Sequence, residues 1–443
     1  MCGVDWHGLA VTGRARVRTV AALAAGVVLA WLVLGSSAAQ ARQGPVAIGV
    51  HRLSGDVYEY DYQLSTGAGP FHEVGVHRVV EVRNGRAIAA RDGVFLVHGD
   101  AWNFDGAFRG GLSPSESIAV FLATKGIDVW GVDLGWTLVP ASTTDFSFMR
   151  GWGLQRDIND VESALRFART IRAQTESSGN QLALLTWSRG GWIGYGLLNE
   201  ESQMPAAERQ VRAFIPVDTY FKVSDPVTRA NACGFANSIN EAIASGTYEN
   251  SNETDKLLGR LADQAPNDVS PVFGPPFTNL QASLEFGAAA WRLGGLITPW
   301  YHFVAGVFPG GTTDDLPTGL LYTTVEDWNS FLRSASPFET LALVRDTWAI
   351  SCSLGATGPF DDHLGDITVP VLYVGAGGGF GRAGLYSLSL LGSSSISTQI
   401  VSFVPESQAR FDFGHVDLFY AGDAAQLVWS PIAAWLQAHS RTG

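Results

Sequence analysis

Short apolar runs alternate with helix-patterned segments between residues 93 and 187, and this alternation limits the possible fold more than any other feature. Each run is bounded by glycine or polar residues and has the length of a buried strand. The three runs are GVFLVHG (93–99), IDVWGVD (127–133) and QLALLTW (181–187). Between them, apolar residues recur at helical spacing, first at Ile118 and Leu122 and later at Leu154, Ile158 and Val161. This order predicts an α/β fold with a mainly parallel central sheet and helices on both faces.

Two segments that precede the first buried run have a different pattern. Residues 57–64 and 73–85 alternate between apolar and polar side chains, and the second segment ends in an Asn-Gly pair. Alternation of this kind is typical of half-buried antiparallel strands, and Asn-Gly is a favoured tight turn. We therefore predict an antiparallel portion ahead of the parallel strands.

The first 41 residues have the pattern of a secretory signal peptide. Three arginines, at 14, 16 and 18, precede an apolar run at 20–34, and Ala39-Gln40-Ala41 follows it. The prediction is an exported protein, secreted or periplasmic, whose mature chain begins at Arg42. The alternative is an N-terminal membrane anchor, although the apolar run is shorter than the ~20 residues that a spanning helix needs.

Export determines how charge and cysteines are interpreted. The 443-residue chain has a net charge of −13, and residues 1–41 contribute +2, so the remainder carries −15. This acidity argues against nucleic acid or an anionic membrane surface as the main partner. Removal of Cys2 with the signal leaves Cys233 and Cys352, for which we predict a disulfide in an oxidising compartment. Two buried free thiols are the alternative.

Ser188 follows the third buried run in the string TWSRGG (186–191). A catalytic serine needs a tight turn with small neighbours, and Gly190 and Gly191 provide them. The carboxyl end of a central strand is also where open α/β sheets bind their ligands. Ser188 is therefore a candidate nucleophile. Alternatively, it caps the following helix and the glycines allow close packing.

Two histidine segments bear on this choice. His98-Gly99 ends the first buried run, where a loop can direct backbone N–H groups at an oxyanion, and His98 itself fits a structural role in the turn. His415 lies beside Gly414 in a loop ahead of an amphipathic terminal helix. A serine hydroxyl becomes a good nucleophile only when an imidazole accepts its proton, and His415 is the candidate base.

The ordered set of these motifs resembles the α/β-hydrolase superfamily, with 117–133 most similar to its lipase and esterase branch. The motifs that carry the resemblance are VFLVHGD, GIDVWGVDLG, TWSRGG, VPVLYVG and GHVDLF. The resemblance covers roughly residues 46–218 and 366–438. It implies Ser188 as nucleophile, His415 as general base, and an oxyanion hole formed by the backbone N–H of Arg189 with that of Asp100 or Ala101.

The chain departs from the family pattern at two places. Thr186 stands where the nucleophile motif normally has a glycine, and the loop GAGGGFG (375–381) has no carboxylate where the family usually carries its acid. Asp218 ends the strand-like segment VRAFIPVD, a position that some lipases use, so it is the predicted acid. A capping carboxylate is the alternative at Asp218. Glu406 and Asp412 are the other candidates for the acid.

Asp417 also lies close to His415 in sequence, and we interpret it as a structural carboxylate.

Residues 219–365 interrupt the strand–helix alternation and are predicted to form a cap between two parts of the core, 42–218 and 366–443. The cap contains aromatic residues that could cover the serine or form the cap's own core. These are Trp291, Trp300, Tyr301, Phe303, Phe308 and Trp328. Cys233 and Cys352 lie near the two ends of this insertion.

The predicted function is an exported serine hydrolase that cleaves a small-molecule or lipid-like carboxylic ester through an acyl-enzyme. A non-catalytic binding or scaffold protein of the same fold is the alternative, favoured by the missing family acid. No metal or nucleotide cofactor is predicted, because no His, Cys and Asp residues have metal-site spacing and the glycine loop lacks a following Lys and Ser or Thr.

Cleavage after Ala41 gives a direct prediction. Amino-terminal sequencing of protein collected outside the cell should read Arg-Gln-Gly-Pro, because signal peptidase cuts after the small-x-small pattern. Recovery of Met1, or of the intact apolar run, would show that the segment is retained.

Overall fold

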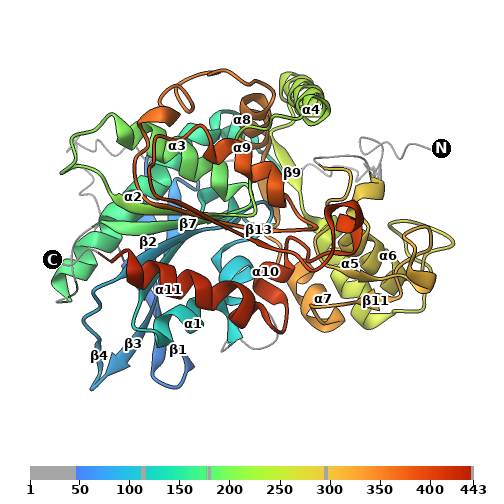
Figure 1. Ribbon diagram of the computed structural model, residues 1–443, viewed down its shortest axis with the longest axis horizontal. Helices are drawn as coiled ribbons and strands as arrows, with labels where there is room; N and C mark the ends of the chain where they lie inside the picture. The colour runs from blue at the N-terminus through green and yellow to red at the C-terminus, as the bar shows by residue number, and fades with distance from the viewer. Residues whose placement is uncertain (1–45, 111–115, 176, 178–180, 294–297, 441–443) are drawn as a thin grey trace, which may run out of the picture. The chain divides into compact units, whose positions relative to one another are not determined.

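The centre of the fold is a ten-stranded mixed sheet (Figure 1). The computed structural model describes residues 46–110, 116–175, 177, 181–293 and 298–440, so the predicted signal peptide lies outside the described residues. The strands of this sheet are β1 (Val46–Ser54), β2 (Val57–Ser65), β3 (Glu73–Arg83), β4 (Arg86–Ala87), β5 (Gly93–Val97), β6 (Asp128–Asp133), β7 (Leu182–Trp187), β8 (Val211–Val217), β13 (Val371–Ala376) and β14 (Ile396–Val401).

The strand order is β1-β2-β3-β6-β5-β7-β8-β13-β14, with β4 paired to β3. The six strands from β6 to β14 in this order run parallel, whereas β1, β2 and β3 are antiparallel to their neighbours. Asn84 and Gly85 form the predicted turn between β3 and β4, both with positive φ. The prediction of a mainly parallel sheet is confirmed.

Helices cover both faces of the sheet. The α-helices of the described residues are α1 (Ile118–Thr124), α2 (Leu154–Gln174), α3 (Gly190–Ser202), α4 (Pro226–Ala244), α5 (Glu253–Gln264), α6 (Asn279–Ala288), α7 (Val325–Arg333), α8 (Leu341–Ser351), α9 (Gly384–Leu388), α10 (Asp417–Tyr420) and α11 (Ser430–Ala438). In Figure 1, α1 and α11 lie on one face and α2 and α3 on the other. Strands β5, β6, β7, β8 and β13 are buried at every residue, which explains why their sequences are mostly apolar.

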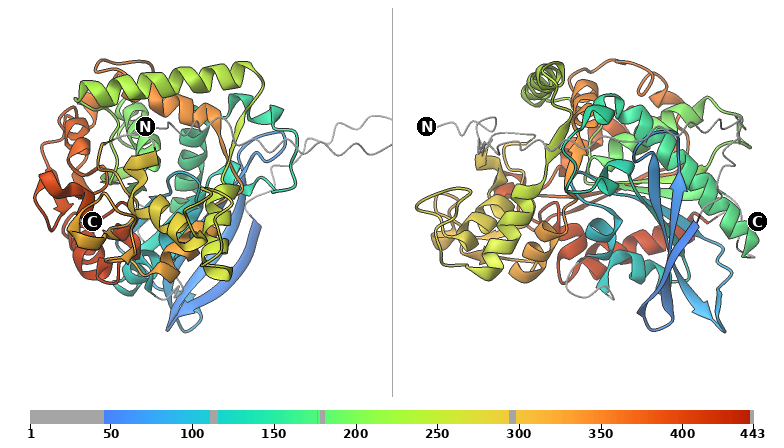
Figure 2. Two further views of the ribbon diagram at one scale, coloured as in Figure 1. Left: turned by 90° about the vertical axis from the view of Figure 1, so that its right-hand side faces the viewer. Right: turned by 180° about the vertical axis from the view of Figure 1, so that it is seen from behind.

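The segment between β8 and β13 corresponds to the predicted cap. It contains α4 to α8 and two small sheets, one of β9 (Glu249–Ser251) with β12 (Phe338–Thr340) and one of β10 (Gly306–Val307) with β11 (Gly319–Leu320). None of these strands joins the large sheet. Helices α5, α6 and α7 gather beyond one end of the parallel strands, as Figure 1 and the left view of Figure 2 show.

Aromatic side chains form the interior of this segment. Trp328 is fully buried and its ring lies 5.9 Å from that of Phe303 and 5.8 Å from that of Phe331. Tyr301 and Phe308 are also buried. These residues therefore serve at least partly as the segment's own core.

Among the described residues, no helix has the length and apolar character needed to span a bilayer.

A disulfide joins Cys233 in α4 to Cys352, which caps the carboxyl end of α8, with their Cα atoms 4.8 Å apart. The bridge closes a loop across 119 positions of sequence and links both ends of the predicted cap.

Removing the bridge should destabilise the fold. The double variant Cys233→Ser/Cys352→Ser should lose up to about 5 kcal/mol of unfolding free energy, because the loop restricts the unfolded chain. Urea unfolding of the oxidised protein and of the variant measures this difference. Two alkylatable thiols in native protein purified without reductant, or equal stability of the two proteins, would contradict the expected role.

Candidate active site

Ser188 lies on a sharp turn between β7 and α3. Its φ is +54°, a left-handed conformation that is uncommon for a residue with a side chain. The backbone N–H of Ser188 donates to Val217 O at 3.1 Å, which fixes the turn against β8. A Cβ atom on Gly190 would lie 2.5 Å from His98 O, and one on Gly99 would lie 2.7 Å from Ser188 Cβ. Glycine is therefore required at Gly190, which follows the turn, and at Gly99, on the loop that faces Ser188.

Thr186, the first departure from the family pattern, has space in this structure. It is fully buried, and a Cβ atom on Gly194 would come within 2.7 Å of its Cγ2 atom. Gly194, one helical turn into α3, therefore leaves the room that Thr186 needs at a position where the family has glycine.

His415 and Asp218 form a buried pair. The Nδ1 atom of His415 lies 2.6 Å from Asp218 Oδ2, and both residues are almost completely shielded from solvent. The carboxylate of Asp218 also accepts three backbone N–H groups, from Ala376 at 2.8 Å, Phe380 at 3.0 Å and Gly381 at 2.8 Å. These three bonds, together with the contact to His415, provide partners for both oxygens of the buried carboxylate.

The glycine loop after β13, which has no acid of its own, thus binds the acid that β8 supplies. A Cβ atom on Gly379 would lie 2.0 Å from Asp218 Oδ2, so only glycine allows the loop to close around the carboxylate. The absence of a carboxylate in 375–381 and the presence of Asp218 at the end of β8 are two aspects of one arrangement.

The other candidate acids are engaged elsewhere. Asp412 accepts from the Ser402 hydroxyl at 2.5 Å and from the N–H of Phe403 and Phe413. Glu406 is exposed, and its nearest ionic partner is Arg382 at 3.8 Å. Among the described residues, neither carboxylate bonds to His415.

Asp417 is buried and bonded to the surrounding backbone, as expected for a structural carboxylate. It accepts from the N–H groups of Ala305 and Gly414, both at 2.8 Å, and from the hydroxyl of Thr323 at 2.6 Å. These bonds connect the cap segment to the loop immediately before His415.

Aromatic rings set the position of the His415 imidazole. Trp187, the neighbour of Ser188, stacks on it with ring centroids 4.9 Å apart, and Phe380 contacts it edge-on at 5.2 Å. In the described part of the chain, no hydrogen bond joins Ser188 Oγ to His415. Catalytic hydrogen bonds are often long in free enzymes and shorten when substrate binds.

His98 supports the loop that faces Ser188. Its Nε2 atom accepts the N–H of Leu134 at 3.2 Å, and its Nδ1–H donates to Gly99 O at 3.0 Å. Burial lowers the pKa of His98, so the ring stays neutral and keeps this bonding pattern. These contacts agree with a structural role.

The structure distinguishes the predicted oxyanion donors. Within the described residues, the backbone N–H groups of Arg189 and Asp100 donate to no protein acceptor. The N–H of Ala101 instead donates to Glu339 Oε2 at 3.4 Å. Glu339, on β12 of the cap segment, is buried and was not expected from the sequence, because 238 positions separate it from Ala101. Asp100 is therefore better suited than Ala101 as the second donor.

The side chain of Arg189 links three segments around Ser188. Its guanidinium pairs with both carboxylate oxygens of Asp100, with Nη2 2.8 Å from Oδ2, and it also donates to Thr347 of α8. The guanidinium lies 5.9 Å from the ring of Trp348. Burial lowers the pKa of Arg189, and the carboxylate of Glu339 opposes this effect. From the sequence, only the backbone of Arg189 is expected to take part in the site, since no local pattern reveals side-chain partners so distant in sequence.

A small pocket opens beside Ser188. Aromatic rings and one ion pair line it. The lining residues are Asp100, Ser188, Arg189, Trp192, Tyr220, Thr347, Trp348 and Phe380. The cap segment thus contributes α8, whereas the six aromatic residues singled out in the sequence are absent from this lining. Two of them, Tyr301 and Phe303, face the His415 ring instead, at 5.6 and 6.5 Å.

Comparison with known proteins gives matches at the level of structure alone. No family model and no curated protein sequence matches the chain. A crystal structure of a candidate lipase from Sulfolobus solfataricus superposes with a TM-score of 0.59 and 16% identity, covering 90% of this chain and 97% of that chain. This chain has the α/β-hydrolase fold.

Two further structures with the α/β-hydrolase fold match with lower scores. A soluble variant of monoglyceride lipase from Saccharomyces cerevisiae, in complex with a substrate analogue, gives a TM-score of 0.44, 12% identity and coverage of 91% of this chain and 99% of that chain. An esterase from Thermogutta terrifontis gives a TM-score of 0.43 and 13% identity, and the match covers 86% of this chain and 99% of that chain. The α/β-hydrolase fold supports many chemistries, so function has to be argued from the site.

The Arg189–Asp100 pair should contribute measurably to stability. In a double-mutant cycle with Arg189→Gln and Asp100→Asn, we expect a coupling energy of about 1 kcal/mol, because the guanidinium is mostly buried and pairs in bidentate geometry. Urea unfolding provides the four free energies. The exposed pair Arg166–Glu162 on α2 is the matched control and should couple by less than about 0.5 kcal/mol. Equal coupling in the two cycles would remove any special role for the buried pair.

Proposed function

We propose that this protein is a serine hydrolase that cleaves a carboxylic ester through an acyl-enzyme. In this mechanism Ser188 is the nucleophile, His415 the general base and Asp218 the acid that orients His415. The observation that carries the proposal is the Asp218–His415 pair, 2.6 Å apart and held by three backbone N–H groups beside a serine with positive φ. This is a costly arrangement for packing alone, because it buries a carboxylate and strains a backbone turn.

The reaction would follow from the roles of these groups. His415 Nε2 accepts the proton of Ser188 Oγ as the hydroxyl attacks the ester carbonyl, while Nδ1–H keeps its bond to Asp218, which stabilises the imidazolium. The N–H groups of Arg189 and Asp100 stabilise the tetrahedral oxyanion. The imidazolium then protonates the leaving alcohol, and a water molecule activated by His415 releases the acid from Ser188.

The pocket supports a small or narrow acyl group. Trp192, Tyr220 and Trp348 provide apolar walls that favour the hydrocarbon part of an ester.

Export belongs to the same proposal, and it is supported by the amino-terminal signal pattern and by the Cys233–Cys352 bridge, a feature of oxidising compartments.

A fluorophosphonate probe tests whether Ser188 is activated. The probe reacts with serine nucleophiles that an adjacent base has activated, so the folded protein should be labelled at Ser188 and Ser188→Ala should remain blank. Peptide mapping identifies the labelled residue. A folded protein that takes no label and hydrolyses no short-chain p-nitrophenyl ester would instead be a binding or scaffold protein with this fold.

Substitution of the acid tests the triad. Asp218→Asn should lower kcat by on the order of 10⁴ while the fold is kept, because the amide no longer holds the reactive tautomer of His415. Adding Ser188→Ala should cause little further loss, since the residues act as a unit.

Asp412→Asn is the matched control, since Asp412 is equally buried and accepts a similar set of hydrogen bonds without contacting His415. Glu406→Gln is the exposed control. Both should retain kcat within a few-fold, with circular dichroism and thermal unfolding confirming the fold. Near-normal kcat in folded Asp218→Asn, or a collapse in either control, would reassign the acid.

A further inference from the structure

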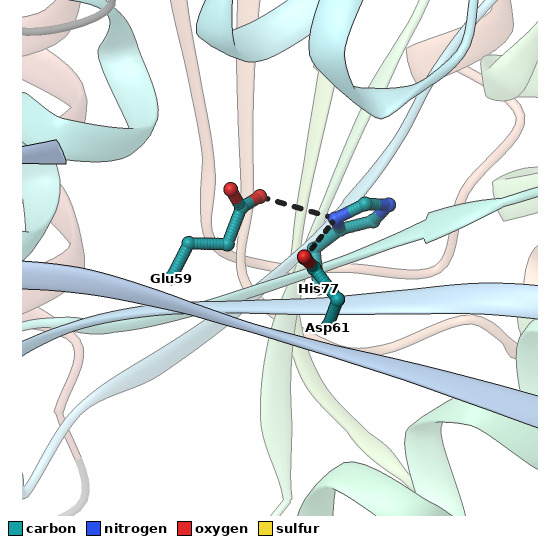
Figure 3. A group of neighbouring side chains, drawn as sticks. All are labelled: Glu59, Asp61 and His77. Carbon is teal, nitrogen blue, oxygen red and sulfur yellow. Dashed lines mark hydrogen bonds and ion pairs between the residues drawn. The ribbon is translucent and has the colours of Figure 1, made fainter. Parts of the chain in front are cut away.

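Glu59, Asp61 and His77 form a cluster on the antiparallel part of the sheet, outside the Ser188 pocket. Glu59 and Asp61 are two positions apart on β2 and so share one face, and Asp61 is the register partner of His77 on β3. One side-chain atom from each residue lies within 4.8 Å of the other two. Figure 3 shows both carboxylates directed at the same ring nitrogen of His77, with Nδ1 3.1 Å from Glu59 Oε1 and 3.2 Å from Asp61 Oδ1.

Each of the three residues is held by a second group on its other polar atom. Arg109 pairs with Glu59 Oε2, and His51 Nε2 lies 3.0 Å from Asp61 Oδ2. His77 Nε2 lies 3.2 Å from Asp133 Oδ2, while Asp133 Oδ1 accepts the N–H of Phe104 at 2.8 Å. A histidine that ligates a metal through one nitrogen usually has its other nitrogen on a carboxylate in this way.

The charges around the cluster are not balanced. Three carboxylates, those of Glu59, Asp61 and Asp133, face His77, and Arg109, the cation that pairs with Glu59, is shared with Asp105. Glu59 is fully buried, and uncompensated charge at such a site is costly.

We propose that Glu59, Asp61 and His77 bind one divalent cation of the Zn²⁺ class through Oε1, Oδ1 and Nδ1. Zn–N and Zn–O bonds of about 2.0–2.1 Å place neighbouring ligand atoms roughly 3.0–3.4 Å apart, which matches both Nδ1···O distances. A mixed set of imidazole and carboxylate favours Zn²⁺ over Ca²⁺ or Mg²⁺, which prefer oxygen ligands alone. The side chains of Asp61 and His77 are 17% and 11% exposed, which leaves a path for the ion.

The site would be structural. It joins β2 to β3 and, through Asp133 and Phe104, to the segment that follows the predicted oxyanion residues. The bound cation would neutralise the cluster and stabilise this side of the sheet. This inference is independent of the chemistry proposed for Ser188.

Zinc binding to the purified, untagged protein tests the site. After treatment with chelator and return of Zn²⁺, elemental analysis should find one Zn²⁺ per chain retained through gel filtration. Calorimetry should show a single saturable site, and Zn²⁺ at 100-fold above Kd should raise Tm by a few degrees. Asp61→Asn and His77→Gln should each weaken binding at least 10-fold and abolish the Tm shift.

His363→Asn is the matched control. His363 also lies near two carboxylates, Asp366 at 3.1 Å and Asp362 at 3.8 Å, but all three side chains are exposed. This variant should bind Zn²⁺ as the original protein does. The proposal is overturned if the original protein retains no Zn²⁺, if folded Asp61→Asn and His77→Gln bind normally, or if His363→Asn loses the ion. Because Asp61 is partly exposed, Asp61→Asn should fold even where His77→Gln does not.

Discussion

The hydrogen bond between His415 and Asp218 is the interaction on which the candidate site depends. A buried carboxylate is stable only when its lone pairs are satisfied, and here the backbone of the loop after β13 does so. That requirement explains why the loop is rich in glycine and why it has no acid of its own. It also fixes the strand neighbours, since β8 and β13 must be adjacent for the carboxylate to reach both the loop and His415.

Much of this arrangement was predictable because short local sequence patterns indicate it. The five fully buried strands have mostly apolar sequences, and the Ser188 turn is marked by its glycines. Asp218 could be proposed from an absence, the missing carboxylate in 375–381, combined with the order of nucleophile, acid and base. By contrast, β14 has mostly exposed or half-buried residues and no continuous apolar run, so nothing in its sequence marks a strand.

The features that escaped prediction are pairings between residues far apart in sequence. Glu339 and Thr347, both in the later part of the cap segment, contact Ala101 and Arg189. Glu59, Asp61 and His77 lack the spacing of a metal motif and meet only because β2 and β3 pair in one register. A shift of that register by one residue would move His77 to the opposite face, so the cluster depends on backbone pairing and not on a sequence motif.

The bridge between α4 and α8 has a consequence for how a ligand reaches the serine. Helix α8 carries Thr347 and Trp348, two walls of the Ser188 pocket, and ends at Cys352, which is covalently fixed to α4. The end of α8 that is nearest these walls therefore cannot swing open as a free flap, because its carboxyl terminus acts as an anchored hinge. A displacement of this end of α8 would therefore carry α4 with it.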